Sequence, residues 1–187
     1  MATMTTGMRI NGIDTEALNR TVAEVRQDPR KGIAGFRVDT RWKGGMRSDT
    51  RVDSWSLGGQ RLPHSFTIPI DEPRELCGGD SAANPQEYLL AAINACMLNT
   101  FVAVCALQGV ELESLSFEAE GELDLRGFLG IDSSVKPGYD EIRTTIRVKG
   151  GGTPEQYEKA HEAMKLLSPN FYNLASPVRL RSAVIAE

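Results

Sequence analysis

The longest apolar segment, NPQEYLLAAINACMLNTFVAVCALQGV at residues 84–110, carries no charged side chain between Glu87 and Glu111. Its start has the signals of a helix N-terminus: Asn84 as the cap, proline at the first helical position and Glu87 at the third. Gly109 suits the C-terminal end. Apolar residues lie all round this helix, so it must be buried on all sides. We therefore predict a long core helix whose burial needs a second copy of the chain.

A run of about twenty uncharged residues also has the length of a membrane span. However, Asn94, Asn99 and two cysteines interrupt this run, and both flanking charges are acidic, whereas a span usually has Lys or Arg on one side. The N-terminus has no apolar region of the kind found in secretory signals. We therefore predict a soluble, cytoplasmic protein with reduced thiols and no membrane partner.

Alternation of apolar and polar residues predicts strands on both sides of the long helix. The other predicted elements are a short helix at 14–28, strands at 34–43, 47–57, 61–70, 115–125 and 139–150, a helix that begins with the TPEQ of 153–156, and a strand at 176–185. This order predicts an α+β fold with helices packed on mainly antiparallel sheet. We expect an N-terminal extension with a short helix, residues 1–32, and one domain, residues 33–187.

After the long helix, charged and apolar residues alternate at the two-residue spacing of a strand. The strand predicted at 115–125 has apolar residues on one face and four acidic residues on the other, namely Glu118, Glu120, Glu122 and Asp124. Arg143 and Arg147 of the next strand are placed to face this acidic row across the sheet. We interpret the pattern as a solvated outer face and not as a binding site.

Composition narrows the function classes. The chain has 187 residues, of which 41% are apolar and 25% charged, which fits one folded domain. A net charge of −4 argues against nucleic acid as the main partner. Three cysteines without a CxxC motif, and two histidines, predict no metal site, and nothing in the sequence indicates another cofactor.

Cys96 is the candidate for chemistry inside the long helix. It lies about three turns from the helix start, beyond the reach of the helix dipole. A buried cysteine in an alanine-rich helix usually packs as a small hydrophobe. A reactive Cys96 needs a positive group, such as an arginine, brought from elsewhere to stabilise its thiolate. From the residues alone, the structural and the reactive interpretations both stand.

The segment DEPRELCGGDSAANPQEYLLAAINACM resembles the signature of the OsmC/Ohr family, the osmotically inducible and organic hydroperoxide resistance proteins. The segment TRWKGGMRSDTRV is similar to the first hairpin of that family, and SPNFYNLASPV is similar to the region of its second cysteine. The resemblance extends over about residues 33–185. It implies mainly antiparallel sheets wrapped around long central helices in an intertwined homodimer.

The resemblance also implies roles for single residues. Cys96 matches the thiolate that attacks the peroxide, and Arg47 is the best match to the arginine that holds this thiolate, displaced by one position. Oxidation gives a sulfenic acid, which then forms a disulfide with a second cysteine. Two positions depart from the pattern: Gln86 stands at the family's catalytic glutamate, with Glu87 one position further on, and Ser168 stands at the resolving cysteine.

Three other residues lie where they bear on this chemistry. An oxidised Cys96 is resolved by a small cellular thiol or, as the alternative, by Cys77, which lies in the loop before the long helix and is able to reach Cys96 if that loop moves. Cys105 faces the opposite side of the helix from Cys96 and is interpreted as core. His161 shares a helix face with Ser168, and either lies near the pocket or is a partly buried histidine without a role in the chemistry.

The favoured hypothesis is a one-cysteine peroxidase that reduces organic hydroperoxides with a thiol reductant and uses Cys96 as nucleophile. The alternative is a family member with weakened catalysis that binds an apolar or electrophilic small molecule in the dimer pocket. Loss of the matching glutamate and cysteine favours this alternative, whereas retention of Cys96 and Arg47 favours the enzyme. A purely structural dimer is the third hypothesis.

Overall fold

The computed structural model describes residues 9–186, and the chain forms two compact units, Met1–Leu89 and Leu90–Glu187. Helix α2 (Pro85–Leu107) begins in the first unit and continues in the second. Each unit is described by itself below. Residues 1–8 of the predicted N-terminal extension lie outside the described residues.

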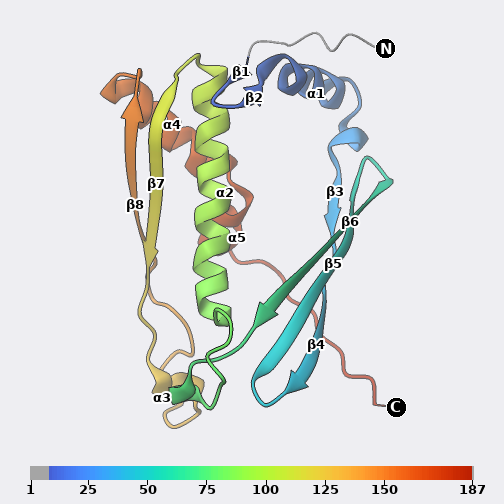
Figure 1. The fold of residues 1–187 in the computed structure, drawn as a ribbon, viewed down its shortest axis with the longest axis vertical. Coiled ribbons are helices and arrows are strands. Elements are labelled where there is room, and N and C mark those ends of the chain that lie inside the picture. The colour runs from blue at the N-terminus through green and yellow to red at the C-terminus, as the bar shows by residue number, and fades with distance from the viewer. Residues whose placement is uncertain (1–8, 187) are drawn as a thin grey trace. The chain divides into compact units, whose positions relative to one another are not determined.

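The first unit is built on a four-stranded antiparallel sheet (Figure 1). Its elements before α2 are β1 (Arg9–Ile10), β2 (Ile13–Asp14), α1 (Thr15–Gln27), the 3₁₀ turn η1 (Pro29–Gly32), β3 (Ala34–Phe36), β4 (Asp39–Gly44), β5 (Arg47–Leu57), β6 (Gln60–Ile70) and the 3₁₀ turn η2 (Arg74–Leu76). Asp14 caps α1 by accepting a hydrogen bond from the N–H of Ala17 at 2.8 Å, which confirms the predicted helix start.

Strand β5 is the centre of this sheet, with β3 and β4 along one edge and β6 along the other. The single strand predicted at 34–43 is therefore wrong in one respect, because β3 and β4 are separate. Phe36 pairs with Trp55, whereas Asp39 pairs with Arg51, so the register shifts between the two segments. The β5–β6 ladder shifts its register in the same part of β5, after Val52.

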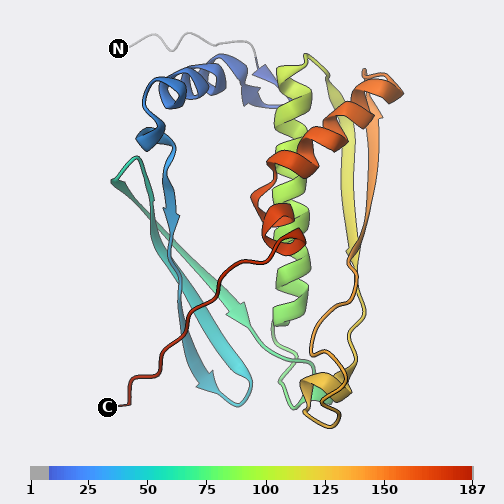
Figure 2. The ribbon, with the colours of Figure 1, turned by 180° about the vertical axis from the view of Figure 1, so that it is seen from behind.

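The second unit continues α2 and adds a two-stranded antiparallel sheet with further helices. The added elements are β7 (Leu112–Glu120), α3 (Leu125–Phe128), β8 (Arg143–Gly150), α4 (Pro154–Leu167) and α5 (Pro169–Ala175). In Figure 1, β7 and β8 lie beside α2, and Figure 2 shows α4 and α5 on the helix from the opposite side. Thr153 and Gln156 form the predicted capping box of α4.

The core of the second unit contains one stripe of α2 and two residues of α4. Buried α2 residues recur at the helical spacing of four, namely Ile93, Met97, Phe101 and Cys105, and they cluster with Ala160 and Met164 of α4. Phe117 and Ile146 pack on this cluster from the sheet. The single chain thus covers one stripe of a helix that is apolar all round.

Both predicted ends of α2 are confirmed. The side chain of Glu87 accepts from the N–H of Asn84, and the N–H of Glu87 donates back to the Asn84 side chain, at 2.8 and 2.9 Å. Gly109 adopts a φ of +72° just after the helix, as a C-terminal stop requires. Among the described residues α2 is the one helix long and apolar enough to cross a bilayer, by length and composition; core helices of soluble proteins pass the same test.

The cross-strand charge pairs are confirmed on the outer face of β7 and β8. The guanidinium of Arg143 lies 3.0 Å from the carboxylate of Glu120, and that of Arg147 lies 2.7 Å from Glu118. All four side chains are more than half exposed, so each pair contributes about 1 kcal/mol or less. This is the solvated face that the alternation predicts.

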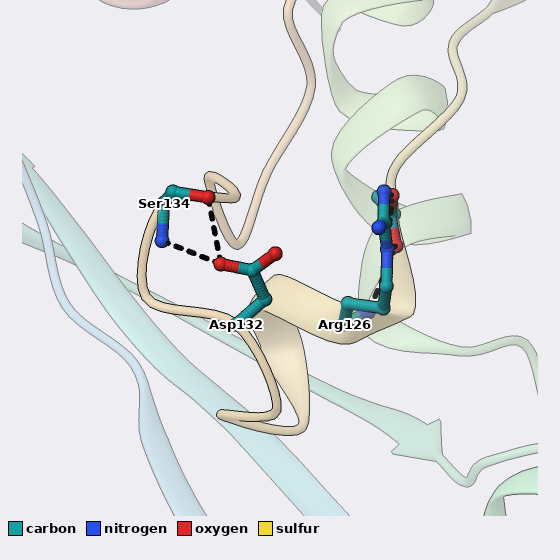
Figure 3. Close-up of polar contacts among 4 residues, drawn as sticks. Arg126, Asp132 and Ser134 are labelled. Atoms are coloured by element: carbon teal, nitrogen blue, oxygen red, sulfur yellow. Dashed lines mark hydrogen bonds and ion pairs between the residues drawn. The ribbon is translucent and has the colours of Figure 1, made fainter.

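Two predicted strands are wrong at their ends. The strand predicted at 115–125 stops at Glu120, because Asp124 instead caps the short helix α3 through the N–H of Arg126. In the same loop, Asp132 accepts hydrogen bonds from the N–H and the hydroxyl of Ser134 at 2.9 and 2.6 Å (Figure 3). The strand predicted at 139–150 begins only at Arg143. Local side-chain hydrogen bonds thus stabilise turns here in place of a longer ladder.

The C-terminal prediction is also wrong within the described chain. Residues 177–186 form no strand up to the last described position, and α5 precedes them where no helix was predicted. A strand needs a partner for its N–H and C=O groups, and no described strand pairs with this segment. The start of α5 has clear local causes, since Ser168 is its N-cap and Pro169 its first residue.

Candidate functional site

The sulfur of Cys96 receives two hydrogen bonds from the start of α5. The hydroxyl of Ser168 donates to Cys96 Sγ at 3.3 Å, and the backbone N–H of Asn170 donates to the same sulfur at 3.5 Å. Cys96 itself is half-buried, and Ser168 is only 1% exposed. The site is therefore made by a residue in the middle of α2 and by the turn that begins α5.

A second contact holds this turn in place. The side-chain amide of Asn170 donates to the carbonyl oxygen of Ala92 at 3.0 Å, one helical turn before Cys96. The hydroxyl of Thr100 donates to the carbonyl of Cys96 at 2.8 Å, one turn after it. Asn170 thus binds α2 through its side chain and the sulfur through its backbone.

Donors that point at a sulfur stabilise a negative charge on it more than they stabilise a neutral thiol. The arrangement around Cys96 is thus suited to hold a thiolate, or the oxygen-bearing sulfur that forms from one. An arginine was predicted for this task, and the contribution of the Asn170 backbone N–H was not predicted. The signal that indicates α5 is the Ser-Pro pair at 168–169, which is a cap followed by a first-turn proline.

Arg47, Gln86 and Glu87 belong to the first unit, and Cys96 to the second. Arg47 is an exposed residue at the start of β5, directly after the turn, and Gln86 is half-buried in the first turn of α2. Glu87 is exposed and is engaged with Asn84 as the helix cap. The role of Arg47 and Gln86 at the thiol therefore stays a prediction.

The loop before α2 is organised around a buried carboxylate. Asp71, 2% exposed, accepts from the hydroxyl of Ser81 at 2.7 Å and from the N–H groups of Gly79 and Glu72. The Ser81 hydroxyl is the largest cause that lowers the pKa of Asp71 from 3.8 to about 2, with these backbone groups as smaller causes. Cys77 lies in this loop, exposed, with a left-handed φ of 64°.

The other accessory residues lie apart from the hydrogen bonds to Cys96. Cys105 is 1% exposed and packs in the core as predicted, and this burial raises the pKa of its thiol. His161 lines a hollow of about 250 Å³ with Phe101, Ile146 and Tyr157. Thr144 and Glu158 also line the hollow, so it suits a small molecule that has both apolar and polar groups.

One group of side chains has metal-ligand spacing within the described part of the chain. Glu158, His161 and Glu162 lie on one turn of α4, with their ligand atoms within 4.8 Å of one another. Glu162 already binds Lys165 at 2.6 Å, and both glutamates are exposed. Ordinary surface ion pairing accounts for this group, and it indicates no metal site.

One family model matches more than half of this chain. The model of the family described as OsmC-like protein matches residues 78–182. The uncharacterized protein YmaD of Bacillus subtilis is 29% identical over 86 residues, which are 46% of this chain and 51% of YmaD. The match thus spans about half the length of that relative. The predicted boundary between residues 32 and 33 stays a prediction.

Solved structures show the same fold. An OsmC-like protein from Mycoplasma pneumoniae has a TM-score of 0.60 and 12% identity, covering 76% of this chain and 88% of its own. A putative osmotic stress induced and detoxification response protein from Psychrobacter arcticus has a TM-score of 0.54 and 13% identity, covering 72% and 84%. At such identities the likeness shows the fold alone. The predicted α+β class with antiparallel sheet is confirmed.

Proposed function

The chain belongs to the OsmC-like protein family, and from this premise we propose that it is a one-cysteine peroxidase that reduces organic hydroperoxides at Cys96. The observation that carries the proposal is the pair of donors on one sulfur, the Ser168 hydroxyl and the Asn170 N–H. A structural core cysteine has no need of such donors, as Cys105 illustrates by packing among apolar residues.

The proposed reaction has two stages. The Cys96 thiolate attacks one peroxide oxygen, the S–O bond forms as the O–O bond breaks, and the alkoxide leaves as an alcohol after taking a proton. Cys96 is then a sulfenic acid. A thiol reductant attacks this sulfur, releases water and forms a mixed disulfide, and a second thiol returns Cys96 to its reduced state. Each turnover reduces one hydroperoxide and oxidises two thiols.

Each neighbouring side chain has a place in this scheme. Ser168 cannot form a disulfide, so the reductant is an external small thiol or Cys77. The Ser168 hydroxyl and the Asn170 N–H hold the sulfur while it is charged. Arg47 stabilises the thiolate and orients the peroxide through its guanidinium. Gln86, in place of a glutamate, offers hydrogen bonds without a charge.

We also propose that the working unit is a cytoplasmic homodimer. The single chain leaves many large apolar side chains exposed, among them Phe36, Trp42, Leu107, Leu180, Val184 and Ile185. Monomeric soluble proteins rarely expose so much apolar surface. The segment after Ser176 also has backbone groups that a strand from a second copy is able to pair.

One observation favours a second candidate function. The hollow lined by His161, Phe101 and Tyr157 suits a small ligand with both apolar and polar groups. If catalysis has been weakened by Gln86 and Ser168, binding of such a molecule is the remaining role. This candidate predicts tight binding without any change of oxidation state at Cys96.

The test is intact-protein and peptide mass spectrometry after brief exposure to one equivalent of cumene hydroperoxide, with a sulfenic-acid trapping reagent present. We expect addition of the trap at Cys96 in the native chain and in Cys105→Ser, and no addition in Cys96→Ser. Consumption of hydroperoxide with a small thiol as reductant should follow the same order. A Cys96 that stays a thiol in the folded protein overturns the peroxidase and leaves the ligand-binding candidate.

A further inference from the structure

A polar hollow of about 360 Å³ opens where the sheet of the first unit changes register. It is lined by Arg37, Val38, Asp39, Arg41, Arg51, Asp53, Ser54 and Arg61. The segment at residues 37–38 separates β3 from β4, and the shifts on both edges of β5 fall at residues 52–54. A bulged, interrupted ladder moves side chains out of the regular strand alternation. The hollow is thus a feature of the sheet, and Cys96 is not among the residues that line it.

The lining of this hollow has a net positive charge, whereas the whole chain has a net negative charge. Four guanidinium groups and two carboxylates line the hollow, an excess of two positive charges in a protein whose net charge is −4. Arg41 binds Asp39 at 2.9 Å, and Arg51 binds Asp53 at 3.2 Å. These two arginines are therefore held in position by carboxylates of their own strands.

The other two arginines keep donors available. The Nε of Arg61 donates to the Ser54 hydroxyl at 2.9 Å, which orients the guanidinium and leaves its two terminal nitrogens for another acceptor. Across the described residues 9–186, no hydrogen bond or ion pair to the guanidinium of Arg37 is found. Clustered guanidinium groups repel one another unless an anion lies between them, and their planar forks match carboxylate and phosphate oxygens.

We propose that this hollow binds a small organic dianion, either a phosphate monoester or a dicarboxylate, between Arg37 and Arg61. Asp39 and Asp53 line the same hollow and accept from hydroxyl or ammonium groups of the ligand. The volume accommodates a ligand of that size.

The test is isothermal titration of the full chain at low ionic strength with glycerol 3-phosphate and with malate, and with glycerol as the neutral control. We expect saturable binding of at least one dianion, weakened by salt. The double variant Arg37→Gln/Arg61→Gln should weaken that binding about tenfold or more, since each lost bond is to a charged group. Tighter binding of glycerol 3-phosphate would identify a phosphate site, and tighter binding of malate a dicarboxylate site.

The matched control is Arg20→Gln/Arg26→Gln on α1, which removes the same charge away from the lining of the hollow. Binding should persist in this control and in Cys96→Ser, so the outcome is separate from that of the peroxidase proposal. An equal loss in both double variants indicates only a net-charge effect and overturns the site. Absence of saturable binding for both dianions overturns it as well.

Discussion

The hydroxyl of Ser168 lies 3.3 Å from the sulfur of Cys96, although 72 positions separate the two residues in the sequence. The fold thus places a serine hydroxyl against this thiol. Because of this contact, the side chain at position 168 lies next to the sulfur of an oxidised Cys96. Changing this one side chain should therefore change how the oxidised thiol is resolved.

The variant Ser168→Cys should form a disulfide with Cys96 after one equivalent of hydroperoxide. The introduced thiol lies in contact with Cys96 and attacks its sulfenic acid, so the S–S bond forms as the sulfenic oxygen leaves as water. Non-reducing peptide mapping should find the cross-linked pair. The control Ser176→Cys, at the end of α5, adds a thiol without this contact and should show no link to Cys96. An unlinked Ser168→Cys would mean that the turn moves on oxidation.

The variant Ser168→Ala should slow the reaction of Cys96 with iodoacetamide by about tenfold, because a hydrogen bond to a charged group contributes about 1.5–3 kcal/mol. The measurement is the alkylation rate of Cys96 by peptide mass spectrometry at fixed pH. Ser116→Ala, on an exposed position of β7, is the matched control and should leave the rate unchanged. An unchanged rate in Ser168→Ala would show that this hydroxyl does not stabilise the thiolate.

The three cysteines should differ in a native alkylation experiment. Cys77 is exposed and should react readily, and Cys96 should react because it is half-buried. Cys105 should stay unmodified, since it is 1% exposed and its burial raises the pKa of its thiol. Addition of denaturant should make Cys105 reactive. Modification of Cys105 in the folded protein would contradict its assignment to the core.

Local signals determined how much of the fold was predictable. Both ends of α2 follow from the Asn84–Glu87 pair and from Gly109, because capping depends on residues a few positions apart. The opposed charges of Arg143 and Glu120 follow from strand alternation. Such features need no knowledge of where distant parts of the chain lie.

The missed features depend on distant parts of the chain. The break between β3 and β4 is a register shift against β5, which no local pattern specifies. The segment predicted as a strand at 176–185 pairs with no described strand, and its own sequence does not specify such pairing. At the site, the position of Ser168 was identified only through the family resemblance. The bond from Asn170 uses a backbone N–H, so its side-chain type gives no clue to it.

The variant Phe101→Ala should lower the free energy of unfolding by about 3–5 kcal/mol, the range for large aromatic truncations in a core. Phe101 is 1% exposed and lies in the buried stripe of α2, with its ring 6.1 Å from that of Phe117 in an edge-to-face arrangement. Denaturant unfolding measures the change. The control Phe128→Ala, on the exposed surface of α3, should cost less than about 1 kcal/mol.

Acid should destabilise the loop before α2 through Asp71. Its pKa is about 2 in the folded chain and 3.8 ordinarily, so the unfolded chain binds the proton more readily. The stabilisation from this carboxylate is thus fully present once the pH is about one unit or more above 3.8. It is lost as the pH falls from there toward 2. Thermal melts between pH 6 and 2.5 should show a falling melting temperature in the native chain.

Replacing the same carboxylate by an amide separates this effect from general acid unfolding. Asp71→Asn should lower the melting temperature by several degrees at pH 7, because an amide nitrogen is unable to accept from Gly79 or Ser81. Its melting temperature should also fall less steeply with acid. Asp80→Asn is the control, since Asp80 is exposed and asparagine tolerates its φ of 55°. Parallel acid curves for Asp71→Asn and the native chain would show that other groups govern the acid response.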